Sequence, residues 1–252
     1  MALSIGTGIT IGGGITFEAI LPPAPWTWDP AYVGIPGLVL SNGNLVVTAI
    51  STQNDNEPSV LGTYPIPANS KVMFSVCALA VTTTDVSGVG VGSHAMDLTT
   101  FIGADYATSQ GVYEDGGNYT QTQTPSNTGL TYNSLNTIDV AIDRVNGLFW
   151  YRTGAPGDMS NWNNSSADPA TATGGYPISD LVGTVYPAAS PYYNANQSIP
   201  PGFSMSGAFG ANSDPGGAVP AGFTFIAATA PVWYWNSLPS GAMKTTFSGR
   251  TV

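Results

Sequence analysis

The sequence predicts an all-β protein, folded as a two-sheet antiparallel β-sandwich with short tails. Short apolar runs rich in Val and Ile alternate with clusters of turn residues along most of the 252 residues. The 31 Gly and 20 Pro supply abundant turns, and both residue types disfavour helix. Apolar residues nowhere keep the three-and-four spacing, bounded by caps, that an amphipathic helix requires.

The first segment of the chain repeats a short motif. Ile-Gly-x-Gly-Ile-Thr occurs twice, and its β-branched residues favour a strand that its glycines weaken. Such a strand is not stable alone, yet burying each aliphatic side chain would contribute about 1.5 to 3 kcal/mol. We therefore expect it to gain a partner from another chain and to anchor the protein. The expected anchor residues are Ile5, Ile9, Ile11, Ile15 and Phe17.

Composition divides the chain into four regions. We expect an anchoring segment at 1–20, a Pro-rich linker at 21–36, a β-sandwich at 37–230 and an aromatic C-terminal tail at 231–252. A proline-rich linker is semi-rigid and would hold the sandwich away from its attachment point. The alternative is that the repeat folds back onto its own sandwich as an edge strand.

The sandwich begins with a hairpin and a long strand. Apolar runs at 38–40 and 45–50 flank an Asn-Gly turn, a strong hairpin signal because both residues tolerate positive φ. The nearly continuous apolar run 71–81 predicts a central strand. The polar stretch 103–135 is expected to form loops around short strands.

A second hairpin is the clearest unit in the chain. Strands are predicted at 137–143 and 148–152, joined by a turn whose key residues are Asp143, Asn146 and Gly147. We expect the carboxylate of Asp143 to accept hydrogen bonds from turn N–H groups, and Gly147 to adopt positive φ.

The low charge excludes several classes of partner. The net charge is −10 with only five Lys and Arg, so a patch that binds phosphate groups is hard to build. No nucleic acid partner is therefore expected. No apolar run reaches 18 residues, so no membrane insertion is expected either. The single cysteine, Cys77, excludes a disulfide framework and is expected to be a buried thiol.

The acidic residues do not predict an active site. Glycosidases need two facing carboxyl groups about 5 to 9 Å apart. Glu18 is near the N-terminus, and Glu57 and Glu114 fall in predicted loops. Asp139 and Asp143 share one face of a strand and could form an acid pair, but we favour a turn-capping role for Asp143 and a solvated or structural role for Asp139.

The sequence also has few residues that could form a catalytic triad or bind a metal. A Ser-His-Asp triad would have to use His94, the only histidine, which follows a Gly-rich strand and which we expect to be structural. One histidine and one cysteine in different elements do not suggest zinc. Loop acids could offer oxygens to calcium, but none has the spacing of a known calcium loop. We expect no enzyme activity, no cofactor and no metal.

Aromatic side chains in the predicted loops are the remaining candidates for binding. Exposed Tyr and Trp stack on sugars or anchor protein interfaces. The alternative is that they pack beneath the long loops. The candidate binding residues are Tyr113, Tyr119, Trp162, Tyr192 and Tyr193.

Several motifs, in order, resemble the SPRY family of concanavalin-like β-sandwiches. The hairpin at 138–151 is similar to that family's strand-turn-strand, and 185–188 resembles its "lyPa" strand. Its closing segment is matched by 206–210 and 220–223, with Ala208 where the family often has Asn. The resemblance implies a bent sandwich that binds or scaffolds, with no catalytic residue to carry over.

The loop at 168–175 and the N-terminal repeat are similar to parts of bacteriophage proteins. The resemblance implies a virion structural protein displayed on the particle, as a capsid decoration, a head fibre or a tail-associated adhesin. Its expected location is the virion. Its expected partners are other virion proteins and further copies of itself, with a host-surface glycan as a further candidate. The alternative function is a free carbohydrate-binding, lectin-like module; a glycosidase is a remote third.

Overall fold

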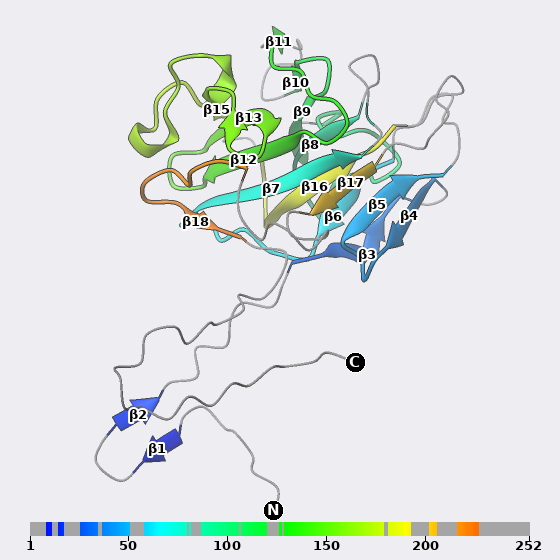
Figure 1. Cartoon of the computed structure of the whole chain (residues 1–252). Coiled ribbons are helices and arrows are strands. Elements are labelled where there is room, and N and C mark those ends of the chain that lie inside the picture. Colours follow the sequence, from blue (N-terminus) through cyan, green and yellow to red (C-terminus); the bar gives the residue numbers. More distant parts are fainter. Residues whose placement is uncertain are drawn as a thin grey trace, which may run out of the picture.

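Two largely antiparallel sheets stack face to face in the computed structural model, with the apolar core between them (Figure 1). The fold predicted from the sequence, an all-β sandwich, is confirmed. The structure describes residues 9–11, 15–17, 26–34, 37–50, 58–79, 81, 87–105, 107–119, 126–127, 129–178, 181–192, 202–205 and 216–226. Within these ranges, no helix is long and apolar enough to cross a membrane.

The first large sheet has seven strands. Their spatial order is β11 (Ser126–Asn127), β10 (Gly117–Tyr119), β9 (Ser109–Tyr113), β8 (Gly88–Ser93), β16 (Val185–Ser190), β6 (Val60–Gly62) and β3 (Trp28–Val33). Every pairing in it is antiparallel.

The second large sheet has nine strands, seven of which follow one path. That path is β14 (Asp158–Met159), β13 (Leu148–Ala155), β12 (Thr137–Asp143), β7 (Lys71–Leu79), β17 (Gly202–Met205), β5 (Val46–Ala49) and β4 (Leu38–Ser41). Off this path, β15 (Tyr176–Pro177) pairs with β13, and β18 (Thr224–Phe225) runs parallel to β7. The long loop after β13 also holds two short 3-10 turns, η1 (Trp162–Asn164) and η2 (Pro169–Thr171).

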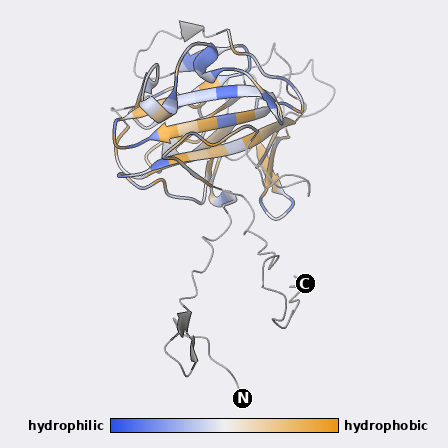
Figure 2. Ribbon diagram, turned by 60° about the vertical axis from the view of Figure 1, so that its left-hand side comes forward, coloured by the Kyte–Doolittle hydropathy of each residue, from blue (hydrophilic) through white to orange (hydrophobic). Residues whose placement is uncertain are grey.

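Alternation along the central strands fills the core. In β12, Ile138, Val140 and Ile142 belong to the main apolar cluster between the sheets. Successive strand residues point to opposite faces, so Asp139 and Asp143 lie on the outer face of the same strand. Figure 2 shows this mixture of apolar and polar residues along the strands of one sheet.

Both predicted hairpins are present. Strands β4 and β5 pair in register, and the turn between them holds Asn42, Gly43 and Asn44 at φ values of 52°, 66° and 65°. Strand β12 pairs with β13 along its whole length, from Thr137 opposite Gly154 to Asp143 opposite Leu148.

The expected linker at 21–36 is wrong for residues 26–34, which include the strand β3. Trp26 and Trp28 are fully buried, with ring centroids 5.6 Å apart, and Trp26 also packs edge-to-face against Phe74 of β7. Burial of two indoles outweighs the turn tendency of the prolines, and β3 is an edge strand, where a proline such as Pro30 is tolerated. Residues 21–25 lie outside the described part of the chain.

The N-terminal repeat forms a small hairpin. Strands β1 (Ile9–Ile11) and β2 (Ile15–Phe17) are antiparallel, with Ile9 opposite Phe17 and Ile11 opposite Ile15. Among the described residues, these two strands pair with each other and with no strand of the sandwich. The edge-strand alternative therefore finds no support in the described pairing.

Two segments of the chain cover the outer face of β12 and β13. The first is the long loop after β13, in which the carbonyl of Thr173 accepts a hydrogen bond from Trp150 Nε1 at 2.8 Å. The second is the segment 216–226. Its Phe223 packs edge-to-face against Trp150, and the backbone N–H of Gly216 donates a hydrogen bond to Asp139. Side chains that would be exposed on a bare sheet are consequently buried here.

Candidate functional site

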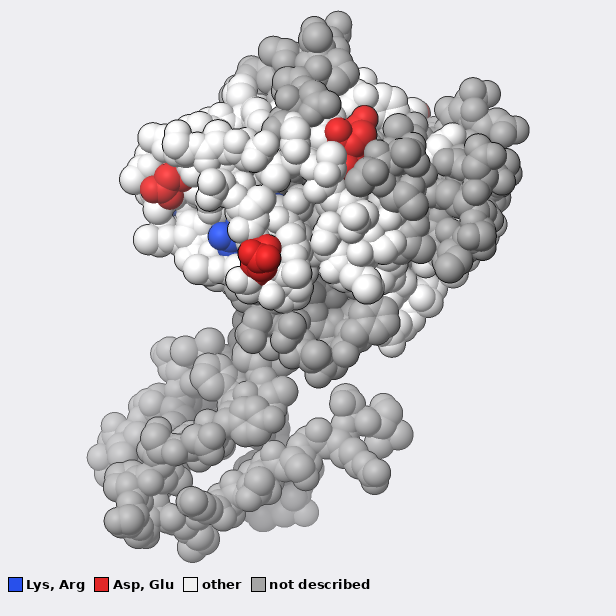
Figure 3. All heavy atoms as spheres, turned by 45° about the horizontal axis from the view of Figure 1, so that its top comes forward, with Lys and Arg blue, Asp and Glu red and all other residues white. Residues whose placement is uncertain are grey.

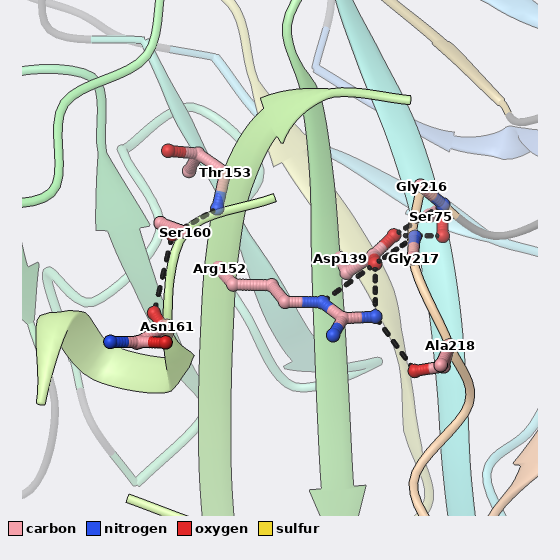
Figure 4. Close-up of polar contacts among 9 residues, drawn as sticks. All are labelled: Ser75, Asp139, Arg152, Thr153, Ser160, Asn161, Gly216, Gly217 and Ala218. Atoms are coloured by element: carbon pink, nitrogen blue, oxygen red, sulfur yellow. Dashed lines mark hydrogen bonds and ion pairs between the residues drawn. The ribbon is translucent and has the colours of Figure 1, made fainter. Parts of the chain in front are cut away.

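Asp139 is the centre of a polar cluster beneath this cover. Its side chain is fully buried on the outer face of β12 and accepts hydrogen bonds from Ser75 Oγ, Arg152 Nε and the backbone N–H groups of Gly216 and Gly217 (Figure 4). The last three donors lie at 3.0 Å. Donors occupy both carboxylate oxygens, so Asp139 is a structural residue and is not placed to act as a general base.

Arg152 completes the ion pair from the neighbouring strand β13. Its Nη2 lies 2.9 Å from Asp139 Oδ2 and donates to the carbonyl of Ala218 at 2.8 Å. The ring of Trp162 lies over the guanidinium of Arg152, and the distance from Cζ to the ring centroid is 4.3 Å. A buried charge is tolerated only when it is paired and hydrogen-bonded, and both conditions hold for Arg152.

The glycines of the covering segment permit this close approach. A Cβ on Gly216 would lie 3.0 Å from Asp139 Oδ1, and a Cβ on Gly217 would lie 2.7 Å from Arg152 Nη2. Each distance is tighter than ordinary van der Waals contact. The Gly-Gly sequence is therefore what allows backbone N–H groups to reach the carboxylate.

Asp143 organises the turn between β12 and β13. Its Oδ1 accepts from the N–H groups of Val145 and Asn146 at 3.0 Å, its Oδ2 lies 2.8 Å from Lys71 Nζ, and Gly147 has φ 65°. This is the turn geometry predicted from the sequence. Burial by itself raises the pKa of Asp143, but hydrogen bonds from Lys71 and Asn146 outweigh it and leave the pKa below its usual value.

The two aspartates on β12 do not form an acid pair. They share the outer face of the strand, as their spacing predicts, but Asp139 is bound to Arg152 and Asp143 to Lys71. Each carboxylate thus has its own cation. The solvated state considered for Asp139 is wrong, because the covering segment removes it from solvent.

Trp162 occupies an ordered loop on top of this cluster. The side chain of the next residue, Asn163, accepts from the N–H of Tyr151 at 2.9 Å and donates to the carbonyl of Gly174 at 2.8 Å. Asp168 caps η2 by accepting from the N–H of Ala170. Trp162 is only partly buried, so it remains a candidate for contact with a ligand.

Tyr113 and Tyr119 lie in strands, contrary to the loop expected for them. Tyr113 is 2% exposed, and its hydroxyl donates to the carbonyl of Ile102 at 2.8 Å. Its ring packs so closely on Gly88 that a Cβ there would lie 2.7 Å from the ring. Tyr119 is half-buried and packs edge-to-face against Tyr113 and Phe101. Strand pairing with Gly-rich neighbours buries these rings, and Tyr113 is not available as a stacking platform.

Of the other predicted site residues, some are described by the structure and some lie outside the described part of the chain. Tyr192 is half-buried, and its N–H donates to Ser87 Oγ at 3.0 Å. Tyr193 and Ile5 lie outside the described residues, and for Ile9, Ile11, Ile15 and Phe17 the structure gives the backbone pairing alone. Glu114, expected in a loop, is buried just after β9, and Cys77, expected to be buried, is half-buried.

Sequence reasoning missed an aromatic stack on the seven-stranded sheet. His94 is exposed and lies between the rings of Tyr32 and Tyr186, with centroid distances of 3.7 and 4.2 Å and nearly parallel planes. The three residues come from β3, the turn after β8 and β16, so no local pattern could reveal them. In the part of the chain that the structure describes, no three His, Cys, Asp or Glu side chains gather as metal ligands.

No protein-family model and no curated protein sequence matches this chain. Solved structures do: the PSpry domain of TRIM65 aligns with 72% of the chain and 91% of its own length, at 12% identity and a TM-score of 0.50. The stonustoxin structure aligns with 72% of the chain, at 13% identity and a TM-score of 0.50, but only 27% of its own length is covered. The likeness shows a SPRY-like fold, as the sequence motifs predicted.

Proposed function

We propose that this chain is a structural protein of a bacteriophage virion, attached through its N-terminal hairpin, with the SPRY-like sandwich displayed outward. The observation that carries the proposal is the register of that hairpin. Residues directly opposite each other in an antiparallel pair share a face, and the faces alternate along each strand. The register therefore assigns one side of the hairpin to Ile9, Phe17, Ile11 and Ile15, and the other side to Thr10 and Thr16.

A hairpin with such an apolar side requires a partner. Two-stranded sheets are at best marginally stable alone in water. Burial of each Ile side chain against another protein would contribute about 1.5 to 3 kcal/mol, enough in sum to attach a subunit. Further copies of this chain or another virion protein are the proposed partners. Capsid decoration, head fibre and tail-associated adhesin are all compatible with this attachment.

The sandwich itself favours display over catalysis. The buried aspartates Asp139 and Asp143 are both engaged by cations and backbone donors. Stability and presentation of a surface are the roles that these contacts serve. We therefore propose that the protein has no enzymatic activity and takes neither a cofactor nor a metal.

The attachment is tested by comparing two variants of the hairpin in assembled particles. Ile9→Ser with Ile11→Ser removes apolar side chains from one side, whereas Thr10→Ser with Thr16→Ser is the matched control on the other. We expect the first pair to abolish incorporation into virions, measured as copy number by quantitative mass spectrometry of purified particles, and the control pair to preserve it. Normal copy number for the Ile pair, or for a deletion of residues 2–17, would contradict anchoring by the hairpin.

A free carbohydrate-binding module is the second candidate, favoured by the partly exposed Trp162 on its ordered loop. The same virion preparation separates the two functions. A chain found only outside particles, yet able to bind a glycan, would be a module of that kind.

A further inference from the structure

Trp162 is a preorganised aromatic surface. One face of its indole lies over the guanidinium of Arg152 at 4.3 Å, and Asp139 and Ala218 hold that guanidinium in place. Arg152 covers one face and Trp162 is only partly buried, so the part of the ring open to a ligand lies on its other face or its edges. A ring fixed before binding loses little side-chain entropy when a ligand stacks on it.

The backbone beside this ring is strained. Asn163 and Asn164 both have φ 50°, two successive left-handed residues that are not glycine. Side-chain hydrogen bonds of Asn163 to Tyr151 and Gly174 keep this conformation in place. Residues in such sparsely populated conformations cluster at ligand-binding sites, where they fix the position of a contact group.

The residues that flank Trp162 in the sequence are polar and uncharged. Asn161, Asn164 and Ser165 are exposed neighbours of the ring in the sequence. The amide of Asn161 can both donate and accept hydrogen bonds, which suits a ligand rich in hydroxyl groups. A protein-binding hot spot would instead be expected to have further apolar groups around its aromatic anchor.

The charges disfavour an acidic ligand. Among the described cations, Lys71 and Arg152 are in ion pairs, and Arg144 donates to the carbonyl of Gly183. The space-filling view shows a face on which charged side chains are few and scattered among uncharged ones (Figure 3). With a net charge of −10, the protein offers an anionic sugar little to compensate its charge.

We propose that Trp162 is the stacking platform of a site for a neutral carbohydrate. The apolar C–H face of a pyranose packs on the free face of the indole, as amphipathic rings favour. The exposed side chain of Asn161 supplies hydrogen bonds to its hydroxyl groups. A role for this site in host recognition rests on the proposed virion function, whereas the binding itself does not.

The test uses the purified full-length chain and defined oligosaccharides. Neutral oligomers of glucose, galactose and N-acetylglucosamine are titrated beside an acidic one, oligogalacturonate, with saturation-transfer NMR and calorimetry as readouts. The variants are Trp162→Ala, Trp162→Met, which keeps a side chain over Arg152 without a flat ring, and Trp162→Phe. Tyr186→Ala, in the aromatic stack around His94 on the other sheet, is the control.

We expect at least one neutral oligomer to bind the wild type, with affinity reduced at least about tenfold in Trp162→Ala and Trp162→Met, reduced less in Trp162→Phe, and unchanged in Tyr186→Ala. Urea melts establish that each variant is folded under the binding conditions. The proposal is overturned if no neutral oligomer binds the wild type, if only the acidic oligomer binds, or if Trp162→Met binds as tightly as the wild type. Trp162-dependent binding by a chain absent from virions would refute the proposed function alone.

Discussion

Removal of the Asp139 carboxylate should be among the most damaging single changes in this protein. In Asp139→Ala, the guanidinium of Arg152, whose side chain is 11% exposed, loses its counter-ion but stays beneath the covering segment. The N–H groups of Gly216 and Gly217 lose their acceptor at the same time. Breaking a buried ion pair by removing one partner costs about 3 to 5 kcal/mol, a large part of the roughly 5 to 15 kcal/mol that stabilises a typical domain.

The assay is urea denaturation of the wild type and the variant, supported by calorimetry. A loss of this size corresponds to a fall in Tm of about 6 to 20 °C, from roughly 2 to 4 °C per kcal/mol for a chain of this size class. Asp158→Asn, at an exposed aspartate on β14, is the control and should change stability by less than about 0.5 kcal/mol.

A double variant distinguishes the ion pair from the loss of packing. Asp139→Leu with Arg152→Met removes both charges and keeps apolar volume, and paired replacements of this type are often neutral or stabilising. We expect the double variant to be more stable than Asp139→Ala. If Asp139→Ala costs less than about 1 kcal/mol, the carboxylate is not the centre of the buried network and the reasoning is refuted.

Three further changes test the neighbouring contacts. The pKa of Asp143 is lowered in the folded state, so its carboxylate should contribute fully to the free energy of unfolding above about pH 5, and this contribution should be lost as the pH falls below about 4. Urea melts of the wild type and Asp143→Asn should therefore converge in acid. Gly147→Val places a β-branched residue at φ 65° and should cost more than about 1 kcal/mol; an unchanged urea midpoint would contradict the turn. Gly217→Ala should cost roughly 1 to 3 kcal/mol, because its Cβ would meet Arg152 Nη2 at 2.7 Å, and wild-type stability would show that the covering segment can shift.

Features specified by neighbouring residues could be predicted from the sequence. The turn after β12 is one example, because Asp143, Asn146 and Gly147 form it within five positions and each has a direct conformational role. The central strand β7 is another, since a continuous apolar run is what a strand buried on both sides requires.

Features that depend on distant partners could not be predicted. Proline-rich sequence around Trp26 and Trp28 indicates a linker locally, and only the contact with Phe74 shows that the two indoles belong to the core. Tyr113 is in a polar stretch that reads as a loop, but pairing with Gly-rich β8 turns that stretch into a buried strand. In both cases tertiary burial overrides local tendency.

The polar cluster around Asp139 also depends on distant partners, and this affects which substitutions the protein should tolerate. Asp139 and Arg152 occupy outward positions of β12 and β13, where charged residues normally meet water. They are buried because the segment at 216–218 crosses above them and the ring of Trp162 lies over Arg152. The polar cluster therefore ties the covering segments to the sandwich, while Trp162 belongs to a loop outside the central strands. Loops on a rigid scaffold tolerate change more readily than the strands beneath them. Substitutions around Trp162 should consequently alter what the surface binds while leaving the fold intact, provided that Arg152 retains Asp139 as its partner.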